Sequence, residues 1–238
     1  MPDVGDPTTR AMTQEKVCVL ISGGLDSGVL ACELAQDYGE VHPVFVRNGL
    51  VWESAELFWL ARFLDAVDQP NIQPVTQLHF PMEDVYGRHW STTGDRVPDA
   101  RAPLDANYLP GRNLILLAKA AVYCVLHQIP VIALGVLRSN PFPDSTPAFF
   151  RQYERLLSRG LNSSVHIITP YAQLTKSDVV RRGRSWPLGL TFSCLAPVDR
   201  RHCGRCTKCA ERREAFRRAG FPDPTDYAGE PPVVGQHG

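Results

Sequence analysis

The chain has 238 residues, of which 44% are hydrophobic and 21% are charged, as is usual for a globular protein with one main domain. Basic and acidic residues balance to a formal net charge of zero, which argues against direct binding of nucleic acid. No apolar run approaches the roughly 18 residues of a membrane span. The polar residues 1–15 do not resemble a secretory signal, so we expect a cytoplasmic protein without a membrane partner.

Short β-branched runs alternate with segments of helical periodicity over most of the chain. Strands are predicted at 16–21, 41–46, 72–80, 130–136 and 165–169. Helices are predicted at 26–38, 53–67, 112–127, 147–159 and 175–182, with a long irregular segment at 81–111. This alternation predicts an α/β fold, a doubly wound parallel sheet with helices on both faces, which binds ligands at the carboxyl ends of its strands.

The chain divides by composition into four parts. A loose leader is expected at 1–15, and the α/β domain at 16–190. A segment at 191–220 holds four cysteines and a basic helix, and a tail rich in Pro and Gly follows at 221–238. The α/β domain is therefore expected to carry a small metal-binding appendage.

The first predicted strand continues into the string Ser-Gly-Gly-Leu-Asp-Ser at 22–27, at the start of a helix. Glycines let phosphate oxygens approach the main chain, and a helix start offers free amide donors. Asp26 can hold a Mg²⁺ ion that bridges phosphates, although a capped tight turn would use the same residue types. We predict that ATP binds here, at Ile21, Ser22, Gly23, Gly24, Leu25, Asp26 and Ser27.

A second string, Pro110-Gly111-Arg112-Asn113, closes the irregular segment and opens an apolar helix. An arginine in the first helical turn opposes the helix dipole, and an anionic ligand would compensate for this. The alternative is an ordinary turn and cap. We predict that Gly111, Arg112 and Asn113 contact the nucleotide.

Four of the seven cysteines lie close together in the sequence, at Cys194, Cys203, Cys206 and Cys209. Four thiolates suit a closed, structural Zn²⁺ site, and an iron–sulfur cluster is the alternative. Many arginines surround these cysteines. We interpret them as a solvated face in preference to a tRNA-binding patch.

Together, these motifs resemble the 7-cyano-7-deazaguanine synthases, a branch of the N-type ATP pyrophosphatases. The string Phe142-Pro143-Asp144, a helix that carries Lys176, and Ser193-Cys194 also fit, and the resemblance spans residues 16–220. It implies a carbon–nitrogen ligase that cleaves ATP, to AMP in preference to ADP. The carboxylate of 7-carboxy-7-deazaguanine would be adenylylated, converted by ammonia to an amide, and dehydrated to the nitrile that serves as a queuosine precursor. A homodimer is also implied.

The resemblance implies roles for individual residues. Asp26, Arg112 and Lys176 would be catalytic. The acceptor would contact Asn48, Gly49, Phe142, Pro143 and Asp144. The loops at 47–52 and 138–146 differ from the family pattern, so a related acceptor remains an alternative, as do a tRNA-thiolating enzyme and a non-catalytic ATP-binding regulator.

Overall fold

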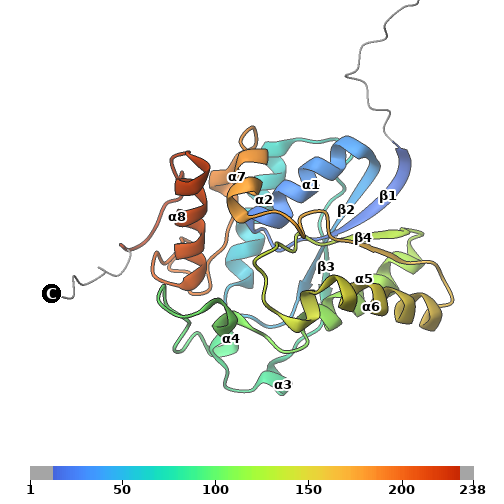
Figure 1. Cartoon of the computed structure of the whole chain (residues 1–238), viewed down its shortest axis with the longest axis horizontal. Helices are drawn as coiled ribbons and strands as arrows, with labels where there is room; N and C mark the ends of the chain where they lie inside the picture. Colours follow the sequence, from blue (N-terminus) through green and yellow to red (C-terminus); the bar gives the residue numbers. More distant parts are fainter. Residues whose placement is uncertain (1–12, 231–238) are drawn as a thin grey trace, which may run out of the picture.

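The computed structural model describes residues 13–230, which form a five-stranded parallel sheet flanked by helices (Figure 1). The strand order is β3-β2-β1-β4-β5. The strands are β1 (Thr13–Leu20), β2 (Tyr38–Arg47), β3 (Thr76–His79), β4 (Val131–Ala133) and β5 (His166–Ile168). The predicted fold class is confirmed. The chain order reverses between β1 and β4, which is where ligands bind in sheets of this kind.

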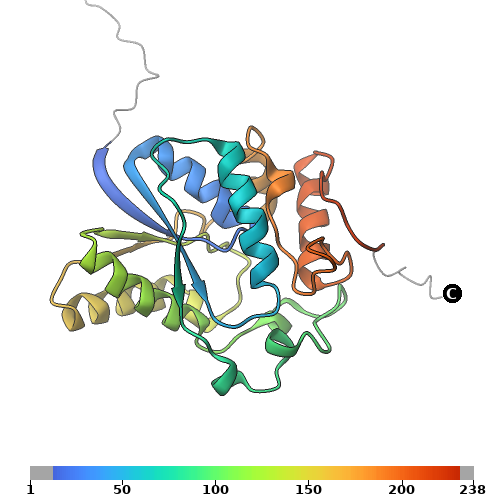
Figure 2. The ribbon, with the colours of Figure 1, turned by 180° about the vertical axis from the view of Figure 1, so that it is seen from behind.

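Helices cover both faces of the sheet, as Figures 1 and 2 show from opposite sides. The longer helices are α1 (Leu25–Asp37), α2 (Glu53–Val67), α5 (Arg112–Leu126), α6 (Pro147–Gly160), α7 (Lys176–Arg182) and α8 (Thr207–Ala219). Successive residues of a strand point to opposite faces. Accordingly, Val17 and Val19 of β1 pack with α1, α2, α7 and α8, whereas Cys18 and Leu20 pack with α5 and α6. Within residues 13–230, no helix has the length and apolar character needed to cross a membrane.

The segment predicted to be irregular contains short ordered elements. These are α3 (Glu83–Tyr86), α4 (Trp90–Thr93) and a 3₁₀ turn (Leu104–Asn107). They pack against a third hydrophobic cluster, in which the rings of Trp52 and Trp90 stack with centroids 5.6 Å apart. All four clustered cysteines also lie in or against this cluster, so the segment joins the body of the domain to the cysteine region.

The first strand and the segment after α8 differ from the expected boundaries. Strand β1 begins at Thr13, three residues before the predicted start. Most of the leader, residues 1–12, lies outside the described residues. In the predicted tail, the Ala228 amide donates to the His202 carbonyl over 2.8 Å, and the Arg213 guanidinium lies 3.7 Å from the ring centroid of Tyr227. Residues 221–230 therefore pack against the cysteine segment.

Candidate active site

An open cleft lies at the carboxyl ends of β1, β2 and β4. One part of its wall is apolar and consists of Leu20, Val44, Val46, Leu116 and Leu134. The opposite part is polar and is formed by the glycine-rich loop with Glu53, Glu56, Arg112 and Asn113. An apolar wall beside a few polar groups is typical of small-molecule and cofactor sites.

The glycine-rich loop has a fixed local geometry. The φ angle of Gly23 is +77°, and a Cβ atom there would lie 2.9 Å from the Glu56 carbonyl oxygen. The hydroxyl of Ser27 accepts from the Ser22 amide at 3.2 Å and donates to the Gly24 carbonyl at 3.3 Å. The two serines hold the turn closed, and only glycine fits at position 23.

Gly135, which the sequence analysis missed, approaches this loop from β4. A Cβ atom at this position would lie 3.1 Å from the carbonyl carbon of Asp26 and 3.2 Å from the Ser27 amide nitrogen. The signal was a glycine near the end of the fourth predicted strand, where strand order reverses. Any larger residue there would push against the main chain of the nucleotide loop.

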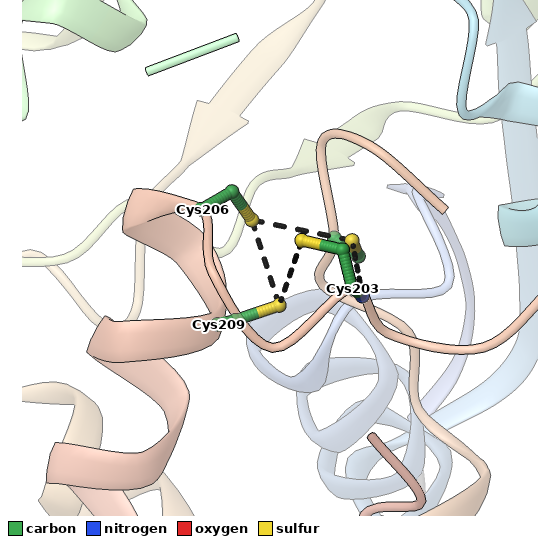
Figure 3. Close-up of side chains that lie close together, drawn as sticks. Cys203, Cys206 and Cys209 are labelled. Atoms are coloured by element: carbon green, nitrogen blue, oxygen red, sulfur yellow. Dashed lines mark hydrogen bonds between the residues drawn. The ribbon is translucent and has the colours of Figure 1, made fainter. Parts of the chain in front are cut away.

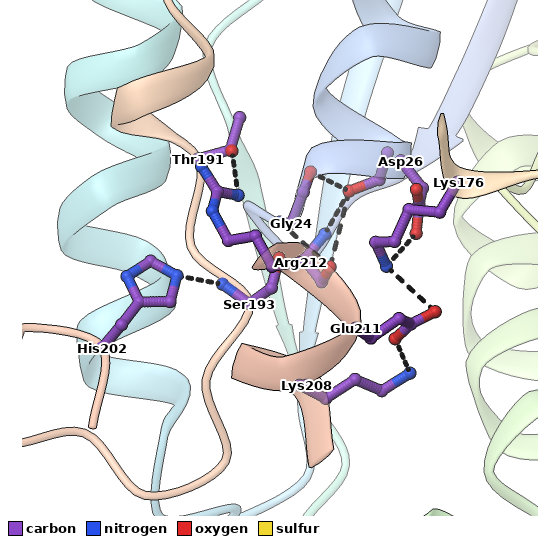
Figure 4. Close-up of polar contacts among 11 residues, drawn as sticks. Gly24, Asp26, Lys176, Thr191, Ser193, His202, Lys208, Glu211 and Arg212 are labelled. Carbon is purple, nitrogen blue, oxygen red and sulfur yellow. Dashed lines mark hydrogen bonds and ion pairs between the residues drawn. The ribbon is translucent and has the colours of Figure 1, made fainter. Parts of the chain in front are cut away.

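Asp26 and Lys176 are 150 residues apart in the chain but meet beside the loop (Figure 4). The Lys176 ammonium donates to Asp26 Oδ2 over 3.0 Å and lies 3.5 Å from Glu211 Oε1. Burial disfavours the charge of Lys176, but the carboxylates of Asp26 and Glu211 outweigh it and raise the lysine pKa. Lys176 is thus a fixed cation at the edge of the cleft.

The other carboxylate oxygen of Asp26, Oδ1, is buried and has no hydrogen-bond partner within residues 13–230. A buried, unpaired carboxylate oxygen beside a phosphate-binding loop is a suitable ligand for Mg²⁺, which takes most of its other ligands from phosphates and water. Asp26 therefore has one oxygen bonded to Lys176 and a second oxygen without a partner in the described part of the chain.

Arg112 stands in the first turn of α5, directly after Gly111, whose φ angle is +75°. Its side chain lines the cleft, and its Nε atom is buried without a partner in the described part of the chain. Glu56 lies nearby. Burial raises the pKa of the Glu56 carboxyl to about 8, an effect that Arg112 opposes and Glu53 reinforces. The cleft therefore places a cation beside a carboxyl group that stays protonated at neutral pH.

Asn113 and Asp144, predicted for the nucleotide and the acceptor respectively, bond to each other. The Asn113 amide donates to Asp144 Oδ2, and its side chain donates to the Asp144 carbonyl, both over 3.0 Å. Asp144 is buried. These bonds cap the start of α5 and fix the 138–146 loop against it.

Asn48 and Gly49 are not among the residues that line the cleft. The Asn48 side chain is buried and donates to the Phe80 carbonyl over 2.8 Å. Gly49, with a φ angle of +81°, lies where a Cβ atom would overlap the carboxylate of Glu83. Both residues shape the turn after β2.

A second, smaller cavity adjoins the cleft at Asp26 and Gly135. Phe142 lines it and packs against the Tyr108 ring at a centroid distance of 5.1 Å, whereas Pro143 is exposed. The sequence analysis did not identify four polar residues that line this second cavity, which are Ser139, Asn140, Lys208 and Glu211. No local motif marks these four residues, because the fold brings them together from the loop after β4 and from α8.

The four cysteines form a cluster at the start of α8 (Figure 3). Their sulfur atoms all lie within 4.8 Å of one another, and the Cys206 and Cys209 sulfurs are 3.5 Å apart. Ligands at the Zn–S distance in a tetrahedral site are about 3.8 Å apart. The cluster is therefore suited to hold a metal ion such as zinc.

The cysteine region also supports the nucleotide loop. The Phe192 amide donates to the Gly23 carbonyl over 2.8 Å. Arg212 is fully buried and donates to Thr191 Oγ1 and the Leu188 carbonyl, both over 2.8 Å. The interpretation of the basic residues as a solvated face is thus wrong for Arg212. This arginine instead holds residues 188–191, behind the nucleotide loop, in place.

Comparisons with known proteins found similar sequences and structures. The family model for "Queuosine biosynthesis protein QueC" matches residues 16–220. A 7-cyano-7-deazaguanine synthase from Anaeromyxobacter sp. is 34% identical over 93% of this chain and 97% of its own length. Another from Rhizobium leguminosarum is 33% identical over 89% and 92%. A solved structure from Methanocaldococcus jannaschii, described as a predicted subunit of tRNA methyltransferase, aligns over 91% of this chain and 93% of its own at 16% identity and a TM-score of 0.48. The sequence matches confirm the resemblance, and the chain belongs to the QueC family.

Proposed function

We propose that this chain is an ATP-dependent ligase that makes 7-cyano-7-deazaguanine from 7-carboxy-7-deazaguanine and ammonia. Family membership supports this proposal, since its relatives are named for that product. The observation that carries it is the 3.0 Å contact of Lys176 with Asp26 beside the glycine-rich loop, where a cation and a carboxylate would face the same phosphates. Once ATP has adenylylated the acceptor carboxylate, ammonia can attack its carbonyl carbon directly, so no protein nucleophile is needed.

The nucleotide is proposed to lie along the cleft. Its adenine would occupy the apolar part between the strand ends, and its pyrophosphate would lie over residues 22–27. Asp26 would hold Mg²⁺, which neutralises phosphate charge, and Lys176 and Arg112 would add positive charge. The hydrogen bonds within the glycine-rich loop, the turn at Gly111 and the bond between Asn113 and Asp144 would hold these nucleotide-binding residues in position.

The reaction follows from the poor reactivity of a carboxylate. A carboxylate oxygen of the acceptor attacks the α-phosphorus of ATP, the bond to the departing pyrophosphate breaks, and an acyl adenylate forms. Ammonia attacks the carbonyl carbon, loses a proton, and AMP leaves to give the amide. The amide oxygen then attacks the α-phosphorus of a second ATP and pyrophosphate departs. Loss of two protons and of AMP, which carries away the amide oxygen, gives the nitrile. The residues contribute positioning and charge neutralisation.

The acceptor is proposed to enter the second cavity. Phe142 offers a flat ring against which a deazapurine can stack, and Asn140 and Ser139 offer polar atoms for its edge. The cavity adjoins the cleft at Asp26 and Gly135, so an acceptor there would lie beside the nucleotide.

The remaining assignments are also proposals. We infer a structural Zn²⁺ at the four cysteines, because all four ligand positions come from protein. We further propose a cytoplasmic homodimer that does not itself bind nucleic acid. A colourless protein with one zinc per chain would exclude the iron–sulfur alternative.

The test is incubation of the zinc-loaded chain with 7-carboxy-7-deazaguanine, ammonium and Mg-ATP. We expect nitrile, AMP and pyrophosphate, with two ATP consumed per nitrile. ADP as the nucleotide product would overturn the proposed chemistry. The absence of turnover with this acceptor, but pyrophosphate release with another carboxylate, would overturn the proposed substrate.

A further inference from the structure

Glu211 lies in a position that the proposed reaction does not by itself explain. It follows Cys209 by two residues in the first part of α8, and its side chain reaches the second cavity. One carboxylate oxygen lies 3.5 Å from the Lys176 ammonium, and the other accepts from Lys208 over 2.9 Å (Figure 4). Through Lys176, Glu211 thus connects α8, which begins at the cysteine cluster, to the nucleotide loop.

The resulting chain of charges alternates in sign, running from Asp26 through Lys176 and Glu211 to Lys208. The Lys176 side chain is only 10% exposed, so water does little to stabilise its charge. Asp26 is its only other carboxylate partner among the described residues, and Mg²⁺ would compete for that carboxylate. A second anion is needed to hold Lys176 in place when Asp26 binds metal.

We propose that Glu211 is a positioning residue that holds the Lys176 ammonium at the nucleotide loop and ties its place to the cysteine cluster. This inference rests on the proposed function only in assigning Lys176 to the phosphates. Glu211 does not touch the nucleotide loop itself. Lys208 fixes the outer oxygen of the Glu211 carboxylate, so the inner oxygen stays turned toward Lys176.

The matched control is Glu214, which is on the same helix one turn later. Glu214 pairs with Arg217 and Arg218 at the surface and makes no contact with Lys176. Replacing either glutamate by glutamine removes one negative charge from α8 and keeps the shape of the side chain. Only the change at position 211 removes an anion from Lys176.

The experiment compares Glu211→Gln and Glu214→Gln in the full zinc-loaded chain. The first readout is the labelling rate of Lys176 by an amine-reactive ester, measured by mass spectrometry without any substrate. Such an ester reaches Lys176 only when the ammonium leaves its place between Asp26 and Glu211, and removal of one of the two anions lets it leave more often. We expect Glu211→Gln to label several-fold faster, and Glu214→Gln to label at the parent rate.

The second readout is pyrophosphate release at saturating ATP and acceptor. We expect Glu211→Gln to lower kcat by about tenfold. Glu211→Asp, which keeps the charge, should restore part of the rate. Zinc content and Tm are measured on every variant, because a purely structural carboxylate would change those first.

Labelling and turnover at the parent rates in Glu211→Gln would overturn the inference. The inference would also be overturned if Glu211→Gln and Glu211→Asp both lost zinc and lost activity to the same extent. Glu211 would then act by stabilising the cysteine cluster. The labelling result does not depend on the acceptor. Failure of the nitrile reaction would therefore leave the test of Glu211 intact.

Discussion

At the scale of single residues, Glu56 gives the clearest dependence on pH. Burial raises its pKa from an ordinary 4.5 to about 8. Between these values the folded chain keeps a proton that the unfolded chain has released. The free energy of unfolding should therefore fall as pH rises through this window. Glu56→Gln should remove this part of the decline, as measured by urea unfolding at pH values from 5 to about 8.

Glu214→Gln is the control for that series. Hydrogen bonds from Arg217 and Arg218 hold the pKa of Glu214 at about 2, so it stays ionised in both states across the same window. The control should keep the slope of the parent protein. Equal slopes for the parent and Glu56→Gln would show that Glu56 is ionised in the folded chain.

Lys176 is the residue on which the proposed chemistry depends most. Lys176→Met removes the cation between Asp26 and Glu211, so phosphate charge that develops during the reaction loses a partner. We expect the rate of pyrophosphate release to fall by about a hundredfold, as on loss of other preorganised charges. Lys176→Arg keeps the charge and should retain more activity. A parent-like rate in Lys176→Met would remove Lys176 from the mechanism.

Sequence reasoning reached Asp26 and Lys176 because each lies in a recognisable motif. It could not reach Glu56 or Glu211, since the role of a glutamate depends on burial and on partners far away in the chain. Asp144 illustrates the opposite case. Its motif was visible, but its carboxylate caps α5 instead of lining the second cavity.

At the scale of elements, the end of β4 presses against the start of α1. Gly135→Ala would place a methyl group 3.1 Å from the Asp26 main chain, which cannot move without shifting the nucleotide loop. Such overpacking costs about 1–3 kcal/mol. We expect affinity for a non-hydrolysable ATP analogue to fall by about tenfold in calorimetric titration. Gly160→Ala, at the end of α6 with no neighbouring atom within 4 Å, should bind like the parent.

The order and type of the main elements followed from periodicity, and α2 has the predicted bounds, Glu53–Val67. Strand boundaries were less accurate. The strand predicted at 72–80 is ordered as β3 only from Thr76, since Pro74 offers no amide donor to a sheet. The packing of the 81–111 segment could not be predicted, because its Trp90 finds its partner, Trp52, on a different element.

At the scale of the whole molecule, the cysteine region and the nucleotide loop form one unit. Removal of zinc by a chelator should loosen residues 188–193, whose Phe192 amide holds Gly23. We expect a lower Tm and weaker binding of an ATP analogue, both measured before and after chelation and restored by added zinc. Cys194→Ser should behave like the stripped protein, whereas Cys32→Ala, at a buried thiol outside the cluster, should still bind zinc. Unchanged nucleotide binding after full zinc loss would show that the cysteine region does not support the nucleotide loop.

The packing of residues 221–230 on the cysteine segment has a consequence for the order of events in the cell. A ribosome makes the sheet first, and strands β1 to β5 are complete by Ile168. Arg212, which fixes the chain behind the nucleotide loop, also donates to Thr225 Oγ1 over 2.6 Å. Thr225 must therefore be synthesised before the loop gains its full support. A nascent chain can fold its sheet before residues 188–225 are in place behind the nucleotide loop.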